Sequence, residues 1–286
     1  MATVLLTIVI SGLVTGAIYA LVAEGLNLIW GVMRIVNLAH GEFLMLGAVL
    51  TYVAWSSWGV NPLLAGGVSF VLLYLFGVVL NRTIIHRVVG SPELISLLLT
   101  FGLSILITNV TVLAFGAEFR QVRYLQDAVY FAGVPIAKNQ LLTAAVAVVL
   151  SLTIYWLLQR TRLGWAIRAV SIDGSMARQV GIDTGRIYSI TFGLGAALAA
   201  VAGALLSMLY AFNPLIGQTF ILKSFAVVVL GGMGNFLGAL LAGLIIGVVE
   251  SGVAFYFSVH LSDAVAFIVI ILTLILRPTG LMGSRL

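Results

Sequence analysis

One short stretch of the sequence gathers several polar side chains between two long apolar runs. Arg34, Asn37, His40 and Glu42 lie within nine residues of one another. Ionisable groups at membrane depth are expensive because hydrocarbon does not hydrate them, so they usually face protein or a water-filled path. Amide, imidazole and carboxylate groups in this pattern indicate a polar, partly broken segment beside a transport pathway.

The same stretch has a second interpretation as a short cytoplasmic turn. Arg34 would then lie at the lipid headgroups, and Asn37 would cap the following helix. Gly41 and Gly47 lower the helical stability of the segment and allow close backbone approach. Irregular backbone at membrane depth is tolerated only where protein or a cavity covers it. The residues alone leave both interpretations open.

A second group of candidate functional residues is the glycine run Gly231, Gly232 and Gly234, which precedes Asn235. We expect this run to break a helix into two short segments. Paired glycine-interrupted segments in two halves of a chain point to an internal repeat with a site between the halves. Residues 41–44 (Gly-Glu-Phe-Leu) and 234–237 (Gly-Asn-Phe-Leu) echo each other, although so short a match also arises by chance in a chain rich in Gly, Ala and Leu.

Motifs for catalysis are missing from the sequence. It holds no G-x-x-x-x-G-K-[ST] phosphate loop, no H-E-x-x-H motif and no complete dinucleotide fingerprint. Its three histidines have no metal-ligand spacing, and the absence of cysteine excludes disulfides and thiol chemistry. We therefore expect no enzymatic activity, no bound metal and no cofactor. Any active transport must draw its energy from another chain or from an ion gradient.

The elements that position these groups are expected to be membrane helices. The 286 residues are 62% hydrophobic and 8% charged, whereas an average soluble domain is about 25% charged. Long apolar runs predict helices, since a β-barrel would show short alternating segments instead. The sequence predicts an all-α fold in one domain over residues 1–286. This fold is a polytopic transmembrane helical bundle with broken or re-entrant segments and eight or nine crossings.

The apolar runs also predict where the helices lie, since a span needs about 20 residues to cross about 30 Å of hydrocarbon. Ser91 is expected to cap the fourth helix, and the alternation in 129–135 favours a short strand or hairpin. The expected spans are 4–23, the second part of the polar stretch around 34–42 with its continuation to about 52, 63–80, 92–115, 140–158, 187–211, 223–250 in two segments, and 262–276.

Residues 159–186 form the most polar loop of the chain. It holds five arginines against Asp173 and Asp183, and the positive-inside bias makes it cytoplasmic. Counting spans places 81–90 and the C-terminal end on the same side, and 116–138 and the N-terminus outside. Residues 175–183 fit a short amphipathic helix ended by Gly181. This helix would dock into a groove of a soluble partner or lie on anionic headgroups.

Three motifs spread over nearly the whole chain resemble one family. They are 31–42 with 45–48 (Gly-Val-Met-Arg-Ile-Val-Asn-Leu-Ala-His-Gly-Glu, then Met-Leu-Gly-Ala), 168–170 (Arg-Ala-Val) through 181–182, and 223–226 (Lys-Ser-Phe-Ala) with 229–235 and 238–239. Together they resemble the membrane permeases of bacterial ABC importers for branched-chain amino acids, of the LivH type. One departure is that the family's coupling loop usually reads Glu-Ala-Ala where this chain has Ser175-Met176-Ala177.

The resemblance implies a multi-pass permease of the bacterial inner membrane. Its partners would be a second, similar permease, most simply a different chain, two cytoplasmic ATP-binding subunits and a periplasmic binding protein. ATP on the partners would drive transport of branched-chain or hydrophobic amino acids, or of a related small solute such as urea or an amide. This chain itself would bind no cofactor.

The resemblance also assigns candidate residues. Residues implied to face the ATPase are Arg168, Ala177, Arg178, Gly181 and Asp183. Residues implied to line or support the passage are Asn37, His40, Gly41, Glu42, Gly231, Gly232, Gly234 and Asn235, with Glu24 and Glu250 as secondary candidates.

A rival hypothesis is an ion-driven secondary transporter or channel that works alone. Such a protein would need carboxylates paired within spans as an ion site. Glu42 and Glu250 are the two candidates that lie deep enough in the predicted spans. The sequence does not decide which solute is carried, nor whether two copies of this chain or two different permeases pair.

Overall fold

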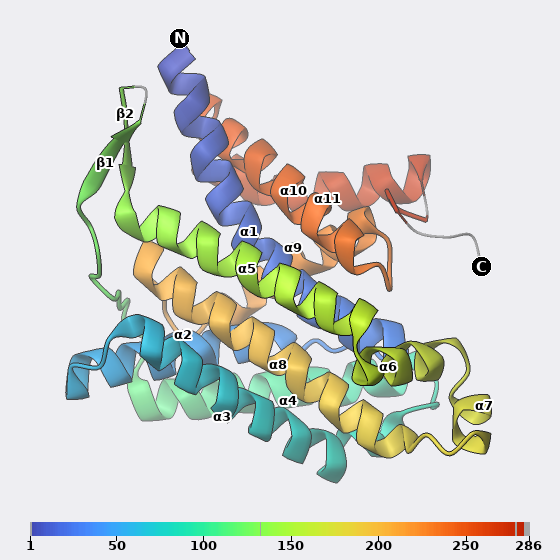
Figure 1. The fold of residues 1–286 in the computed structure, drawn as a ribbon. Coiled ribbons are helices and arrows are strands. Elements are labelled where there is room, and N and C mark those ends of the chain that lie inside the picture. Colours follow the sequence, from blue (N-terminus) through green and yellow to red (C-terminus); the bar gives the residue numbers. More distant parts are fainter. Residues whose placement is uncertain (1, 132, 278, 283–286) are drawn as a thin grey trace.

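The computed structural model describes residues 2–131, 133–277 and 279–282, and within these ranges the chain is a bundle of helices with one small hairpin (Figure 1). The helices are α1 (Ala2–Met33), α2 (His40–Trp58), α3 (Pro62–Thr83), the 3₁₀ turn η1 (Ile85–Val88), α4 (Glu93–Phe115), α5 (Lys138–Arg160), α6 (Arg162–Ile172), α7 (Gly174–Gln179), α8 (Thr184–Leu209), α9 (Ile216–Gly231), α10 (Phe236–Tyr256) and α11 (Val259–Leu276). Strands β1 (Ala128–Phe131) and β2 (Val134–Ala137) pair antiparallel, with Ala128 opposite Ala137. The predicted hairpin is therefore confirmed.

The helices make this a multi-pass membrane protein. Six of them, α1, α3, α4, α5, α8 and α10, are long and apolar enough to cross a bilayer. Helices α9 and α11 contribute shorter apolar segments, and α2 has 19 residues. The predicted helical bundle is confirmed, whereas the count of eight or nine crossings stays a prediction.

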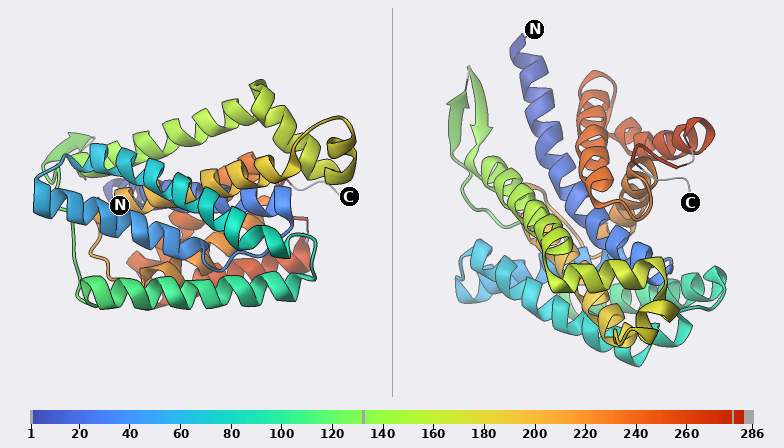
Figure 2. Two further views of the ribbon diagram at one scale, coloured as in Figure 1. Left: turned by 90° about the horizontal axis from the view of Figure 1, so that it is seen from below. Right: turned by 45° about the vertical axis from the view of Figure 1, so that its right-hand side comes forward.

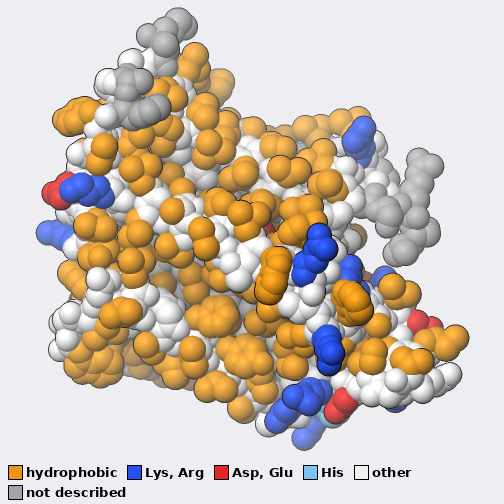
Figure 3. Space-filling model, in the orientation of Figure 1, with side chains coloured by type: hydrophobic (Ala, Val, Ile, Leu, Met, Phe, Trp, Pro, Cys, Tyr) orange, Lys and Arg blue, Asp and Glu red, His pale blue; other side chains and the backbone are white. Residues whose placement is uncertain are grey.

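Polar loops far apart in the sequence share one end of the bundle. Asn81, Arg82 and His86 line the same hollow as Asp183 and Arg186. Two views place α6, α7 and the end of the described chain at this end, and the hairpin and the start of α1 at the other (Figures 1 and 2). Figure 3 shows a largely hydrophobic face on which Lys and Arg side chains gather toward the α6–α7 end. This arrangement agrees with the sidedness predicted from charge.

Polar side chains start several helices, as the sequence predicts for capping residues. Asn61 Oδ1 accepts a hydrogen bond from the Leu63 N–H at 2.9 Å, with Pro62 in the first helical turn. Helix α4 differs from the expectation, because Pro92 rather than Ser91 precedes its first residue and no side chain caps it. Helix α1 also runs ten residues past the expected end at 23, because Glu24 and Asn27 are buried by protein rather than exposed to lipid.

Helix α8 lies at the centre of the bundle. At its closest contacts its backbone touches the backbone of a neighbouring helix, and no space remains for a side chain. The helix is almost entirely buried, and its Gly203 lies against the carbonyl oxygen of Leu44 on α2. Gly47 of α2 lies in turn against the backbone of Ala200. Small residues let helix backbones approach closely where no hydrophobic force drives association in lipid. The tight helix contacts predicted for this glycine- and alanine-rich segment are confirmed.

We expect Gly203→Ala to destabilise the protein by about 1–3 kcal/mol, the usual cost of overpacking. The added Cβ would overlap the carbonyl oxygen of Leu44. Gly67→Ala in α3 is the matched control, because a Cβ there meets nothing within 4 Å. Thermal unfolding of both variants in detergent measures the effect. Equal melting temperatures would show that α2 and α8 can separate without cost.

Candidate functional site

The polar stretch 34–39 is a return segment rather than a simple turn. Arg34 has a φ of 54°, and the chain then doubles back so that His40 Nε2 lies 2.9 Å from the Val22 carbonyl oxygen. Val22 lies eleven residues before the end of α1, about 16 Å along the helix. Thr100 of α4 holds the segment, since its Oγ1 accepts from the Leu38 N–H at 3.1 Å. The predicted broken polar segment is confirmed, and helix α2 starts inside the bundle.

The residues at the start of α2 are buried. His40 and Glu42 are at most 1% exposed, and Asn37 is fully buried. The Asn37 side chain makes no hydrogen bond to any described residue, and the N-cap of α2 is Ala39. The interpretation in which Asn37 caps the helix is therefore wrong, because Asn37 lies two residues before the N-cap residue Ala39.

Helix α9 starts at the same place as α2. Gly41 lies against the carbonyl oxygen of Gly217, the second residue of α9, and a Cβ at Gly217 would lie 2.5 Å from Glu42 Oε2. Ser104 Oγ of α4 donates to Glu42 Oε1 at 2.9 Å, while Oε2 has no hydrogen-bond partner among the described residues. The positive ends of two helix dipoles thus face one carboxylate, which stabilises its negative charge.

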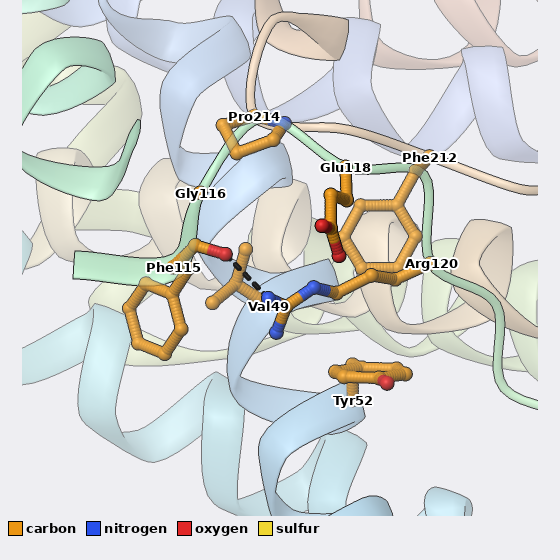
Figure 4. Close-up of a pocket in the computed structure, with 8 residues that line it drawn as sticks. All are labelled: Val49, Tyr52, Phe115, Gly116, Glu118, Arg120, Phe212 and Pro214. Atoms are coloured by element: carbon orange, nitrogen blue, oxygen red, sulfur yellow. Dashed lines mark hydrogen bonds between the residues drawn. The ribbon is translucent and has the colours of Figure 1, made fainter. Parts of the chain in front are cut away.

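The segment that precedes α9 is also a return segment. Phe212 lies beside Tyr52, with ring centroids 6.3 Å apart, whereas Gly217 reaches Gly41, eleven residues back along α2 or about 16 Å. Arg120 anchors the outer end. Its backbone pairs with Phe212 at 2.8 and 2.9 Å, and its guanidinium lies 5.3 Å from the centre of the Tyr52 ring (Figure 4).

The two return segments suit an internal repeat. It relates residues 37–42 to 213–218 rather than 41–44 to 234–237, the pair that the sequence echo suggested. Residues 37–42 (Asn-Leu-Ala-His-Gly-Glu) and 213–218 (Asn-Pro-Leu-Ile-Gly-Gln) share Asn and Gly at equivalent positions and have Glu opposite Gln, and Gly41 touches Gly217 at the centre. Helices α1 and α8 run in opposite directions before these segments (Figure 1), so the repeat is inverted. The echo between 41–44 and 234–237 is not the one that the fold brings together. In transporters, discontinuous helices that meet in this way form the binding region.

The glycine run forms a bend at the far end of α9, as predicted. Gly232 and Gly234 have φ values of 100° and 83°, which glycine adopts readily. Asn27 of α1 spans the bend, since its Oδ1 accepts from the Gly234 N–H at 2.5 Å and its Nδ2 donates to the Asn235 carbonyl at 2.7 Å. Asn235 then caps α10 through the Gly238 N–H at 2.9 Å.

The structure therefore divides the predicted passage residues into two groups. Gly41 and Glu42 meet the start of α9, whereas Gly231 and Asn235 lie at its end, about 21 Å away along the helix. The residues predicted from the sequence did not include Asn27, Ser104 and Gly217, although a polar residue such as Asn27 deep in an apolar helix is a usable signal.

The secondary candidates Glu24 and Glu250 lie apart from Glu42. Ser151 Oγ donates to Glu24 Oε2 at 2.8 Å, and Glu250 bonds to Tyr19 and Lys223. Glu42 and Glu250 share no hydrogen-bond partner among the described residues. The pairing of Glu42 with Glu250 that the rival hypothesis would need is therefore not seen among the hydrogen bonds of the described residues.

The loop 159–186 folds into two helices, α6 and α7. Asp173 caps α7, and its pKa is held below the usual value because the Met176 N–H, the Ser175 hydroxyl and the Ser175 N–H donate to its carboxylate. Helix α7 ends in a Schellman motif, in which the Gly181 and Ile182 N–H groups bond to the Arg178 and Ala177 carbonyls at 3.1 and 3.0 Å. Gly181 has the φ of 87° that this motif needs. The predicted glycine-ended helix is confirmed.

The five residues expected to face an ATPase have different surroundings. Ala177 is only 4% exposed and packs within the chain. Arg168 Nη1 donates to Gln159 at 2.8 Å, Arg178 Nη2 donates to Thr184 at 3.2 Å, and Asp183 caps α8 through the Arg186 N–H at 3.0 Å. Gly181 lies open at the surface, and a Cβ added there would meet nothing within 4 Å. Their role in coupling stays a prediction.

Apolar side chains stand exposed beside these residues. Ile172, Met176 and Val180 are 84%, 60% and 77% exposed. Next to them, a hollow of about 340 Å³ lies between the end of α3, η1 and the start of α8, and is lined by Arg82, His86 and Arg186 among others. An apolar ridge beside a basic hollow is suited to contact with another protein.

Comparison with known proteins gives a consistent result. The family model described as "Branched-chain amino acid transport system / permease component" matches residues 8–274. The chain is 34% identical to the high-affinity branched-chain amino acid transport system permease protein LivH of Salmonella typhimurium, over 96% of this chain and 94% of LivH. It is 30% identical to the corresponding permease protein LivM of the same organism, over 80% of this chain and 60% of LivM.

A solved structure has a similar fold. A chain of "PsaBC from Streptococcus pneumoniae in complex with Fab" superposes with a TM-score of 0.52 and 12% sequence identity, and covers 94% of this chain and 91% of that chain. At this identity the likeness concerns the fold alone.

We expect Asn27→Ala to loosen the bend between α9 and α10. The change removes two hydrogen bonds to residues 234 and 235, which together contribute about 2 kcal/mol. Amide exchange at 233–236 should therefore rise about thirtyfold. Asn109→Ala is the control, because Asn109 is exposed and its side chain donates to the Ile105 carbonyl of its own helix. Hydrogen–deuterium exchange measures both variants. Equal protection would mean that glycine geometry alone holds the bend.

Proposed function

Because the chain belongs to the permease family of branched-chain amino acid transport systems, we propose that it is the membrane permease subunit of an ABC importer for branched-chain or other hydrophobic amino acids. The observation that carries this proposal is the meeting of α2 and α9 at Gly41 and Gly217, with Glu42 between them. Half-helices that start inside a bundle are a recurrent architecture of transport sites. In this proposal the passage runs beside this point, and related small solutes such as urea or amides remain alternatives for its cargo.

We propose that the passage opens and closes at the contact between Glu42 of α2 and Gly217 of α9. Glu42 is buried and holds one carboxylate oxygen without a hydrogen-bond partner among the described residues. That oxygen is available to a mobile group, such as water or a solute, when α2 and α9 move apart. Asn37 and His40 support the same region, while Gly231, Gly232, Gly234 and Asn235 supply a bend on which α9 and α10 can turn.

Energy is proposed to come from ATP bound to two cytoplasmic partner subunits, with no cofactor on this chain. Helices α6 and α7 are the proposed contact surface for these subunits, through the exposed Met176 and Val180 beside Gly181. The exposed apolar side chains favour a protein groove. Ser175 and Met176 stand where the resembling family usually carries Glu and Ala, so the contact here would be apolar rather than acidic.

The remaining partners follow from the family. Salmonella typhimurium holds two permease proteins, LivH and LivM, that are both similar to this chain. We therefore propose that this chain pairs with a second, different permease in the bacterial inner membrane. A periplasmic binding protein would deliver the solute at the opposite end, where the hairpin and residues 116–127 lie.

Gly181→Trp should abolish co-purification of a soluble ATP-binding subunit with the tagged chain. The side chain would stand on the proposed contact surface and would strain a left-handed backbone position. Gly59→Trp is the matched control. Gly59 also has a positive φ, of 62°, and open surroundings, but it follows the end of α2 that lies away from Gly41. If the wild type retains no ATPase with all host partners present, the ABC-permease proposal is wrong.

Glu42→Gln should reduce uptake by the assembled importer at least tenfold while leaving assembly intact. The change removes the charge that faces two helix starts and lowers stability by only about 1 kcal/mol. Glu93→Gln, in the exposed first turn of α4, is the control. Uptake of radiolabelled leucine into proteoliposomes measures the effect, and normal uptake by Glu42→Gln would place the passage elsewhere.

A further inference from the structure

A second charged cluster lies among α1, α9, α10 and α11, on another side of α9 from Glu42. Lys223 Nζ lies 3.2 Å from Glu250 Oε2, 3.0 Å from Asp263 Oδ1 and 3.0 Å from the Tyr19 hydroxyl. The Tyr19 hydroxyl donates to Glu250 Oε2 at 2.6 Å. The Lys223 and Glu250 side chains are 10% and 7% exposed. Charges placed so deep between membrane helices mark functional positions by default.

The charges of the cluster favour a cation over an anion. One ammonium group lies between two carboxylates, so the three groups carry a net negative formal charge. Glu250 Oε1 is buried and has no hydrogen-bond partner among the described residues. A buried carboxylate oxygen without a donor is costly, and an N–H donor with positive charge would satisfy both the hydrogen bond and the charge. An anion would gain nothing here, because Lys223 is already paired on two sides.

The cluster also reaches the surface of the chain. The Asp263 side chain is 58% exposed, although it belongs to α11, whose neighbouring side chains Phe267 and Ile271 are apolar and exposed. A carboxylate of this exposure cannot face hydrocarbon without a large cost. Its open side must therefore face water or another protein.

We propose that Asp263, Lys223 and Glu250 form a subsite of the passage that takes the ammonium group of the transported amino acid. Asp263 is the exposed entrance, and Glu250 Oε1 is the buried acceptor. Lys223 holds the two carboxylates together when no substrate is present. This inference rests on the proposed function, and it narrows the cargo to solutes that carry a protonated amine.

The first test measures whether Asp263 faces water. The chain contains no cysteine, so Asp263→Cys and the control Ile271→Cys on the same helix each give one thiol in this subunit. In the assembled importer in membranes, a charged, membrane-impermeant thiol reagent should label position 263 at least tenfold faster than position 271. Leucine with its binding protein should slow labelling at 263. Equally slow labelling at both positions would mean that lipid or a subunit contact covers Asp263, and would overturn the proposal.

The second test measures the role of the charge. Asp263→Asn keeps an oxygen that can accept from Lys223 but removes the negative charge, so uptake at low leucine concentration should fall about tenfold, as for one lost charge-assisted hydrogen bond. Uptake should recover at high concentration. Glu93→Gln, which removes an exposed acid in the first turn of α4, is the control. A deaminated analogue of leucine, 4-methylpentanoate, should compete poorly in the wild type.

The outcomes separate this inference from the proposed function. If the wild-type importer takes up no leucine, the proposed function has failed. If the wild type transports leucine while Asp263→Asn behaves like Glu93→Gln, or while 4-methylpentanoate competes as well as leucine, the ammonium subsite is wrong and the proposed function stands. Loss of uptake by Asp263→Asn at every concentration, with unlabelled Asp263→Cys, would assign the cluster to a subunit contact instead.

Discussion

The contact between Gly41 and Gly217 is the constraint on which the rest of the structure depends. Both helices begin inside the bundle, so the chain must double back twice, before α2 and before α9. Each return segment exposes backbone groups where no water is available, and such backbone is tolerated only where protein covers it. Thr100 covers the first segment, and Arg120 with Tyr52 covers the second. Only glycine at both positions lets the two starts meet, since a Cβ on either would overlap the other backbone.

The buried carboxylates inside the bundle lie in separate clusters, and each has its own hydrogen-bond partners. Glu42 lies between two helix starts, Glu24 bonds to Ser151, and Glu250 lies beside Lys223 and Tyr19. Each buried carboxylate has one oxygen that is bonded and one that has no partner among the described residues. Groups that are held but incompletely satisfied favour a second conformation or a bound solute. A transport protein must cycle between such states, so the clusters are consistent with the family to which the chain belongs.

The two ends of the bundle differ in chemistry. One end presents exposed Ile172, Met176 and Val180 beside the basic hollow at Arg82 and Arg186. The other end presents a hairpin and the anchored loop at Arg120. Helix α9 runs from the middle of the bundle, where its start touches α2, to the bend that Asn27 of α1 holds. A movement of this bend can therefore reach the Glu42 region through one helix of 16 residues.

The sequence by itself determined the class of fold, which loops share one end of the bundle, and the location of the breaks at 34–39 and 232–235. Apolar content, positive charge in 159–186 and the glycines at 231–234 are local properties that act wherever the chain lies. Only the tertiary structure decided that Gly41 meets Gly217 rather than the 234–237 echo, that Asn27 holds the distant bend, and that Lys223 bridges Glu250 and Asp263. These pairs lie far apart in the chain, and a periodicity or a cap carries no information on which faces meet. Their distances depend on how long helices cross, which is set by packing over the whole bundle.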